Sequence, residues 1–248
     1  MKVIISPAKT QDFEKPTTTK KFTQPTLLKQ TKVLMKELEK LSKKDIVKLM
    51  SVSDKIAELN YERFHDYKFP FNLKNAKQAL FAFQGDVYRD IDIENYNDKE
   101  MTFAQDHLRI LSGLYGLLRP LDLIQPYRLE MKTKLKNPAG KDLYEFWGQQ
   151  ITAALQDDTV INLASNEYSK ALKNFSGRMI TPVFKEIKDG QPKIIAIYAK
   201  LARGTMSNFI IKTQITKPEK IQEFNQDGYK FQPKLSNEDE FVFHRKSR

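Results

Sequence analysis

The sequence has no cysteine, one tryptophan and only three histidines among its 248 residues. Without cysteine the chain can form neither a disulfide nor a thiolate metal site, and such a composition is compatible with a reducing compartment. The histidines, His65, His107 and His244, lack the spacing of a metal-binding motif. We therefore expect no metal site and no cofactor.

Long apolar runs are missing as well. The apolar start at residues 1–7 is too short for a signal peptide, and no later run approaches the length of a membrane span. We expect a cytoplasmic protein that does not contact a membrane. The familiar nucleotide-binding and hydrolase motifs, such as GxGxxG, the Walker A loop, GxSxG and HExxH, are also absent. Whether the chain is an enzyme stays open.

Positive charge is what the sequence has in excess. Lysine and arginine number 42 against 31 acidic residues, a formal net charge of +11, which favours a polyanionic partner such as nucleic acid. Residues 1–50 hold twelve lysines against five acids, whereas residues 86–106 hold seven acids. The uneven distribution predicts one basic and one acidic face. A general lysine bias that only solvates the surface is the alternative.

The order of patterns predicts one mixed α/β (α+β) domain spanning residues 1–248. Strands are expected at both ends and in the middle with helices between them, and neither a linker nor a repeat divides the chain. Residues 26–120 are expected to form a helical lobe on a mixed sheet, and the basic tail at 244–248 to fray. Residues 75–83 fit a helix and a buried strand equally. The expected helices are 26–42, 42–50, 53–67, 98–111, 142–155, 204–215 and 218–225, and the expected strands are 2–5, 126–131, 160–164, 179–187, 193–198, 228–232 and 240–244.

The sequence pattern is organised around residues 108–131. An apolar helical pattern runs into SGLYG at 112–116, restarts briefly and stops at Arg119–Pro120, which predicts a helix, a hairpin and a short second helix. Glycines at such a hairpin let a phosphate approach backbone N–H groups. The match to the L-x-G-x-G hairpin of helix-hairpin-helix modules is partial, because these glycines stand three apart. A glycine cap between packed helices is the alternative. The candidate anion contacts here are Ser112, Gly113, Tyr115, Gly116 and Arg119.

Four further cations are candidates for anion binding. Lys9 follows the first strand, and Arg128 lies on the polar side of the strand expected at 126–131. Lys200 and Arg203 precede the helix expected at 204–215, where cations would oppose the positive helix end unless they face an anion. We expect these four to meet in a cleft between the helical lobe and the sheet. A plain surface lysine at position 9 is the alternative there.

Three carboxylates are candidates for proton transfer. Asp86 follows a glycine, Glu130 shares the polar side of its segment with Arg128, and Glu167 follows the strand expected at 160–164. A structural turn at Asp86 and an exposed Arg128–Glu130 salt bridge are the alternatives.

Several sequence islands together resemble one family. They are SPAKT at 6–10, GDVY at 85–88, SGLYG at 112–116, RPLD at 119–122, PYRLEM at 126–131, FWG at 146–148, NLAS at 162–165, EY at 167–168 and YAKLARG at 198–204. In this order they resemble the YaaA family of bacterial peroxide-stress proteins over essentially the whole chain. The resemblance implies a cytoplasmic protein with the cantaloupe fold, a positively charged cleft, a helix-hairpin-helix element, binding of double-stranded DNA and a role in limiting iron-driven oxidative damage. It implies no catalytic mechanism.

Two functions therefore compete. The first is a protein that holds duplex DNA by its phosphates, with little sequence preference. The second is an enzyme acting on a nucleotide, a nucleobase or another anionic small molecule, with the cations binding charge and Asp86, Glu130 or Glu167 moving protons. A deep, enclosed pocket holding these residues would favour the enzyme, and an open basic groove would favour the DNA-binding protein.

Overall fold

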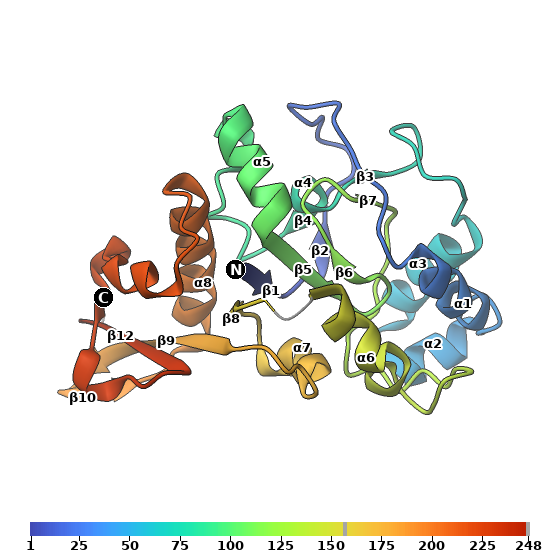
Figure 1. The fold of residues 1–248 in the computed structure, drawn as a ribbon. Helices are drawn as coiled ribbons and strands as arrows, with labels where there is room; N and C mark the ends of the chain where they lie inside the picture. Colours follow the sequence, from blue (N-terminus) through green and yellow to red (C-terminus); the bar gives the residue numbers. More distant parts are fainter. Residues whose placement is uncertain (156–157, 247–248) are drawn as a thin grey trace.

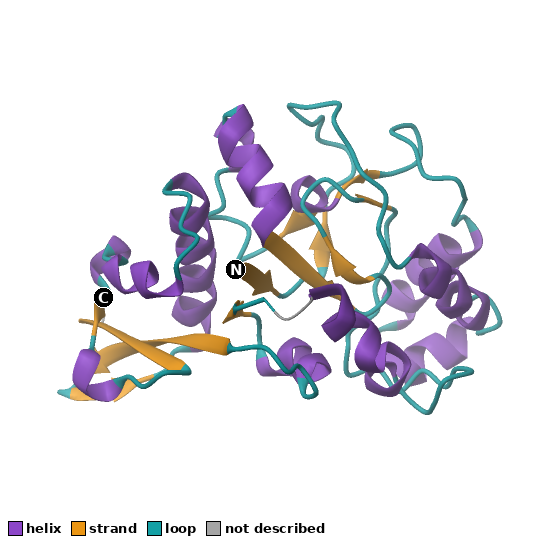
Figure 2. Ribbon diagram, viewed as in Figure 1, coloured by secondary structure: helices purple, strands orange, loops and turns teal. Residues whose placement is uncertain are grey.

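The computed structural model describes residues 1–155 and 158–246 of the chain (Figure 1). Strands run through the middle of the molecule and into its C-terminal end, with helices packed around them (Figure 2). Within the described residues, eight strands form one sheet whose central strands are parallel. This arrangement confirms the mixed α/β class predicted from the sequence.

The main sheet has the order β11-β12-β9-β8-β1-β5-β6, with β10 paired to β9. The pairs β5–β6, β9–β10 and β11–β12 are antiparallel, and the others are parallel. The strands are β1 (Lys2–Ile5), β5 (Leu108–Ser112), β6 (Gly116–Leu118), β8 (Val160–Leu163), β9 (Met179–Lys188), β10 (Gln191–Lys193), β11 (Lys230–Phe231) and β12 (Glu240–Lys246).

Strand β1 lies between β8 and β5 and sets the register of the sheet centre. Ile5 is the partner of Leu163 on one side and of Ile110 on the other. Val3, Ile4 and Ile5 are at most 2% exposed. Strands covered on both faces read as continuous apolar runs, which is why the runs at 2–5 and 160–164 could be assigned from sequence.

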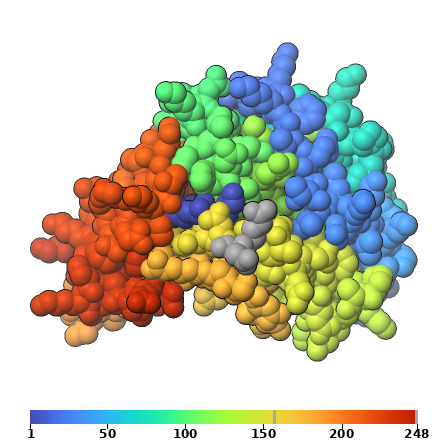
Figure 3. Space-filling model, viewed as in Figure 1, coloured from blue at the N-terminus to red at the C-terminus, as the bar shows by residue number. Residues whose placement is uncertain are grey.

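Helices α1 (Leu28–Leu38), α2 (Lys43–Met50) and α3 (Asp54–His65) confirm the three expected N-terminal helices. They lie together at one side of the molecule, away from the C-terminal strands (Figure 1). Helix α1 buries Leu34 and Leu38, and α2 begins with a capping box between Ser42 and Asp45. The space-filling view places these helices and the C-terminal segment at opposite ends of one face, with the middle of the chain between them (Figure 3).

The remaining elements are shorter or lie around the sheet. Residues 75–83, which fitted both a helix and a strand, contain β3, α4 and the start of β4. The remaining α-helices are α4 (Ala79–Ala82), α5 (Asp98–His107), α6 (Leu143–Leu155), α7 (Asn166–Ser169) and α8 (Ala196–Lys212). The 3-10 helices are η1 (Ile93–Asn95), η2 (Lys170–Leu172), η3 (Pro218–Glu223), η4 (Gln226–Gly228) and η5 (Pro233–Leu235). Two small sheets pair β2 (Thr10–Gln11) with β4 (Phe83–Gln84) and β3 (Lys77–Gln78) with β7 (Leu123–Ile124).

The helix-hairpin-helix prediction at residues 108–118 is wrong. Helix α5 ends at His107, and the apolar run after it is strand β5, which pairs with β1 and turns back as β6. A short apolar run fits a buried helix and a buried strand equally well, and here the neighbouring strand decides. Neither the phosphate-binding hairpin nor its glycine-cap alternative between two helices describes this β-hairpin.

Three other boundaries differ from expectation. Residues 126–131 form no ladder, although their alternation of buried and partly buried side chains is present. Helix α8 begins at Ala196, so the strand expected at 193–198 ends early and the helix expected at 204–215 starts sooner. Residues 244–246 pair with β9, so fraying there is wrong, and residues 247–248 lie outside the described residues.

The predicted lobe at residues 26–120 contains α1 to α5 but also supplies β5 and β6 to the main sheet. One connected cluster of buried apolar side chains extends from the N-terminal helices to the C-terminal strands, with Leu34, Ile110 and Phe243 among its fully buried members. Among the described residues, none of the helices combines the length and apolarity that crossing a bilayer requires.

Candidate functional site

A pocket of about 380 Å³ lies beside the residues that follow β1 and β8. We call it the inner pocket. Its position follows from the parallel pairing, since ligands of open α/β sheets bind beyond the carboxyl ends of the strands. The lining residues are Ser6, Pro7, Ala8, Lys9, Thr10, Gln11, Gln84, Gly85, Asp86, Val87, Tyr88, Tyr127, Arg128, Leu129, Glu130, Lys132, Leu163, Ser165, Glu167, Tyr168, Lys200 and Arg203.

The ends of β1 and β8 are tied together at the base of this pocket. The backbone N–H of Ser165 donates to the Ser6 Oγ at 2.9 Å, and the Tyr88 hydroxyl donates to the Ser6 carbonyl at 2.8 Å. These bonds fix the start of the segment that carries Lys9 and bring the loop after Gly85 against it.

The β5–β6 hairpin supports the pocket from behind. A Cβ atom on Gly113 would lie 2.3 Å from the Leu129 carbonyl oxygen, so residues 126–131 pack directly on the hairpin backbone. The Tyr127 hydroxyl and the Ser112 Oγ are 2.6 Å apart. Tyr127 and Leu129 thus point inward, and the side chains between and after them, Arg128 and Glu130, line the inner pocket.

The hairpin residues predicted to contact an anion are therefore packing residues. Ser112 and Tyr115 are 0% exposed, and Gly113 and Gly116 are buried. Gly116 has a φ of +70°, and an added Cβ would lie 2.7 Å from the Trp147 ring. Glycine is needed there for both reasons. None of the four lines the inner pocket.

Arg119 is also placed away from the inner pocket. Its Nη2 lies 2.9 Å from the Oδ1 of the buried Asp122 and donates to the Gln24 carbonyl at 3.0 Å. The guanidinium thus holds the turn after β6 to the loop before α1. Because the Asp122 carboxylate already neutralises the Arg119 guanidinium, Arg119 does not offer the free cation that was expected to bind an anion.

Glu130 is shared by three cations at one side of the inner pocket. Its carboxylate lies 3.2 Å from Lys9 Nζ, 3.2 Å from Arg128 Nη2 and 3.3 Å from Lys132 Nζ. Burial alone would raise the pKa of Glu130, but the hydrogen bond and charge of Lys9, together with Lys132, outweigh burial and lower the pKa. Glu167 Oε2 also lies 3.9 Å from Lys132 Nζ, but two carboxylates still face three cations, so positive charge remains in excess here.

Helix α8 contributes Lys200 and Arg203 to the wall of the inner pocket. A Cβ atom on Gly204 would lie 2.1 Å from the Val87 carbonyl oxygen, so the helix and the loop after Gly85 touch backbone to backbone. This contact places Lys200 Nζ 3.7 Å from Asp86 Oδ2. The pocket therefore has a further ion pair, looser than the contacts of Glu130.

Arg203 differs from the other cations of the inner pocket. Its side chain is half-buried, and burial lowers the pKa of its guanidinium. In the part of the chain that the structure describes, no carboxylate pairs with it. A partly desolvated cation that lines a pocket and has no carboxylate partner is a candidate position for an anion.

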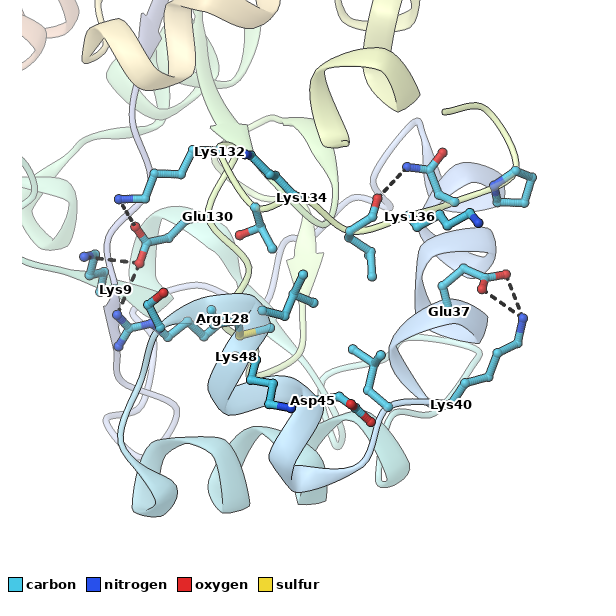
Figure 4. A pocket seen from close by; sticks show the side chains of 18 residues that line it. Lys9, Glu37, Lys40, Asp45, Lys48, Arg128, Glu130, Lys132, Lys134 and Lys136 are labelled. Carbon is cyan, nitrogen blue, oxygen red and sulfur yellow. Dashed lines mark hydrogen bonds and ion pairs between the residues drawn. The ribbon is translucent and has the colours of Figure 1, made fainter. Parts of the chain in front are cut away.

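A larger hollow of about 1080 Å³ adjoins the inner pocket, and we call it the outer groove (Figure 4). Lys9, Arg128, Glu130 and Lys132 line both. Figure 4 shows three cations gathered around Glu130 on one side of the groove and Lys40 paired with Glu37 on the other. The remaining lining residues are Leu41, Asp45, Lys48, Leu49, Met50, Ser51, Thr133, Lys134, Leu135, Lys136, Asn137 and Pro138.

The groove lysines were missed from the sequence. Thr133, Leu135 and Asn137 are at most 9% exposed, whereas Lys132, Lys134 and Lys136 between them are exposed. The period-two pattern of MKTKLKN at 131–137 was the available signal, because alternation in an extended segment puts every second side chain on one face. Lys48 on α2 completes the basic lining, and no sequence motif marked it.

The structure thus brings together seven of the predicted site residues. They are the cations Lys9, Arg128, Lys200 and Arg203 and the carboxylates Asp86, Glu130 and Glu167, and all line the inner pocket. Glu167 joins the cluster through Lys132, whose backbone N–H donates to Glu167 Oε1 at 3.3 Å. The five residues Ser112, Gly113, Tyr115, Gly116 and Arg119 lie elsewhere.

Two of the histidines have backbone contacts. His65 Nδ1 lies 2.8 Å from the Tyr61 carbonyl oxygen, and His107 Nδ1 lies 2.7 Å from the Met1 carbonyl oxygen. Within residues 1–155 and 158–246, no cluster of three or more His, Asp or Glu side chains has the arrangement of a metal site.

Comparison with known families agrees with the motifs that build this site. A family model described as peroxide stress protein YaaA matches residues 1–235 of the 248. The matched region contains every residue of the inner pocket and of the outer groove. The chain belongs to the YaaA family of peroxide stress proteins.

Proposed function

We propose that this protein binds double-stranded DNA in the outer groove through phosphate contacts, with little sequence preference, and thereby helps limit iron-driven DNA damage during peroxide stress in the cytoplasm. The observation that carries the proposal is the charge of the groove. Among the described residues, seven lysines and arginines line it against three carboxylates. A surface of this kind attracts a polyanion and steers its approach.

The carboxylates of the groove reduce this excess only partly. Glu37 pairs with Lys40 at 2.9 Å, Asp45 caps α2 through Ser42, and Glu130 is shared by three cations. Within the described residues, no carboxylate pairs with Lys48, Lys134 or Lys136. These lysines supply uncompensated charge for phosphates.

The spacing of the lysines supports contact with a phosphate backbone. Lys132, Lys134 and Lys136 are exposed at every second position of residues 132–136 and all line the outer groove, so three ammonium groups of one short segment face it. Flexible ammonium groups bind phosphates as point charges and do not read base edges. Binding through them would therefore depend little on the DNA sequence.

Phosphate neutralisation also offers a physical route to protection from iron. Cations condensed around DNA are released when lysines or arginines neutralise the phosphates. Ferrous ions held at those phosphates would be released with the other counter-ions. The protein would then lower the amount of iron that reacts with peroxide at the DNA, without binding iron itself.

Titration of labelled duplexes at several salt concentrations tests the proposal. We expect log affinity to fall linearly with log salt, with a slope of roughly −0.9 per phosphate contacted, and duplexes of different sequence to bind alike. Affinity that is independent of salt, or strong preference for one sequence, would contradict phosphate binding in the groove.

A second function is favoured by the inner pocket. All seven convergent residues line this pocket. Its volume of about 380 Å³ lies within the range of roughly 300–1,000 Å³ that is usual for small-molecule sites. An enzyme acting on a nucleotide, a nucleobase or another anionic small molecule would use the cations for charge and Asp86, Glu130 or Glu167 for proton transfer. Direct titration of mononucleotides separates this function from duplex binding.

A further inference from the structure

The inner pocket and the outer groove adjoin and share part of their lining. Lys9, Arg128, Glu130 and Lys132 line both hollows. A nucleic-acid strand lying along the groove lysines can therefore extend one end or one unpaired nucleotide into the pocket. The lining residues of the inner pocket determine which chemical groups of that strand it can receive.

One part of the pocket is suited to an anion. Arg203 is half-buried and has no carboxylate partner in the part of the chain that the structure describes. Arg128 gives one guanidinium N–H to Glu130, but its buried Nε has no hydrogen-bond partner. Because guanidinium N–H groups that lack a hydrogen-bond partner and are withdrawn from water favour a planar or tetrahedral oxyanion, these two positions suit a phosphate.

The carboxylates of the pocket argue against a bare polyanion as its occupant. Asp86, Glu130 and Glu167 line the same cavity as the cations. Carboxylates repel additional phosphates but accept hydrogen bonds from hydroxyl and amino groups. A ligand with one phosphate and several N–H or O–H donors can pair its phosphate with the cations and its donors with the carboxylates of the pocket.

Size and wall chemistry further restrict the ligand. The volume of about 380 Å³ far exceeds the needs of inorganic phosphate. Tyr88, Tyr127 and Tyr168 contribute to the wall, and the hydroxyls of Tyr88 and Tyr127 are occupied by Ser6 and Ser112. Tyr88 and Tyr168 are 7% and 8% exposed, so the exposed edges of their rings offer a base a small apolar contact.

We propose that the inner pocket binds one nucleoside monophosphate unit, with its phosphate at Arg203 and Arg128 and its sugar and base donors at Asp86 and Glu167. The unit is either a free mononucleotide or an end or unpaired nucleotide of a strand in the outer groove. The strand form rests on the proposed DNA binding, whereas the mononucleotide form stands without it.

Isothermal titration calorimetry of the full chain with dAMP, deoxyadenosine and inorganic phosphate tests the pocket. We expect dAMP to bind at least tenfold more tightly than deoxyadenosine, which lacks the phosphate, and than inorganic phosphate, which lacks the nucleoside. Arg203→Gln should weaken dAMP at least tenfold and leave blunt-duplex affinity within twofold. Lys200→Gln, at an exposed position of the pocket, should also weaken dAMP and provides a variant whose folding is not in question.

Arg63→Gln is the matched control. Arg63 is likewise a half-buried arginine whose pKa is lowered by burial, but it lies on α3 and lines neither the inner pocket nor the outer groove. We expect it to bind dAMP as the parent does. Equal losses in Arg203→Gln and Arg63→Gln, with Lys200→Gln unchanged, would overturn the pocket assignment.

Competition distinguishes the two sources of the nucleotide. If dAMP displaces a duplex with a single-stranded overhang but not a blunt duplex, the pocket takes strand nucleotides. If dAMP binds and displaces neither, the pocket takes free mononucleotides. Duplex binding without any dAMP or overhang effect overturns this inference and leaves the groove proposal intact, whereas dAMP binding without duplex binding supports the inference and contradicts the groove.

Discussion

Gly113 and Leu129 pack backbone to backbone, because a Cβ atom on Gly113 would lie 2.3 Å from the Leu129 carbonyl oxygen. The contact joins the β5–β6 hairpin to the segment that carries Arg128 and Glu130. Trp147 reinforces it by donating its indole N–H to the Gly113 carbonyl at 2.9 Å. The glycine-rich motif therefore acts on the candidate site through packing and never touches the inner pocket.

Replacing Gly113 by alanine should destabilise the protein and distort the inner pocket. The added methyl group must displace the Leu129 backbone, and overpacking of this kind costs typically about 1–3 kcal/mol. Urea unfolding measures the loss of stability, and calorimetry with dAMP measures the effect on the pocket. Gly190→Ala is the control, because its Cβ would meet nothing within 4 Å and only its φ of +73° would be strained. Unchanged stability of Gly113→Ala would contradict this packing.

Neutralising Glu130 should lower stability at neutral pH and less so in acid. Its pKa in the folded protein is below the ordinary value of 4.5, because Lys9 and Lys132 outweigh the opposing effect of burial. A carboxyl with a depressed folded pKa stabilises the protein above its unfolded pKa, and this contribution is lost as the pH falls through the folded pKa.

We therefore expect Glu130→Gln to lose on the order of 1 kcal/mol of unfolding free energy at pH 7, since two of its cation partners are largely exposed. The difference from the parent should shrink as the pH falls below about 4.5. Glu223→Gln removes the exposed ion pair with Lys220 and serves as the control. Urea unfolding at pH 7, 5 and 3.5 checks the trend, and a constant difference over that range would contradict it.

The protein purified under native conditions should contain no stoichiometric iron or zinc. The expectation rests on the absence of cysteine and on three histidines scattered through the sequence. Elemental analysis of the purified chain provides the measurement. About one metal ion per chain, lost on substitution of His65 or His107, would contradict the prediction.

Much of the sheet could be predicted because parallel strands leave a strong local signal. Residues 2–5 and 160–164 are apolar runs without helical spacing, and Asp189–Gly190 supports the turn between β9 and β10 with φ values of 54° and 73°. The residues near 108 and 196 gave no such signal. Both apolar runs fit the period of a helix and the period of a strand, so their tertiary neighbours determine the structure. Residues 108–112 pair with β1 as a strand, whereas residues 196–212 pack as a helix against β9 and α5.

Individual residues of the candidate site could be predicted from the sequence, but their convergence could not. Lys9, Arg128, Lys200 and Arg203 could be chosen individually because each is a cation at an element boundary or on a polar face. Their convergence depends on the Gly113–Leu129 and Gly204–Val87 contacts, which join segments far apart in sequence. The lysines at 132, 134 and 136 carried a readable alternation, but an exposed charge pattern looks the same on any solvated segment.

The most direct test of phosphate binding compares Lys134→Glu with Lys193→Glu. Both lysines are exposed and both substitutions lower the net charge by two, but only Lys134 lines the outer groove. In duplex titrations at several salt concentrations, we expect Lys134→Glu to lose roughly tenfold or more in affinity near 0.1 M salt and about one unit of log–log slope. Lys193→Glu should stay within about twofold of the parent. Equal losses in both variants, or no loss in Lys134→Glu, would contradict binding of DNA in the outer groove.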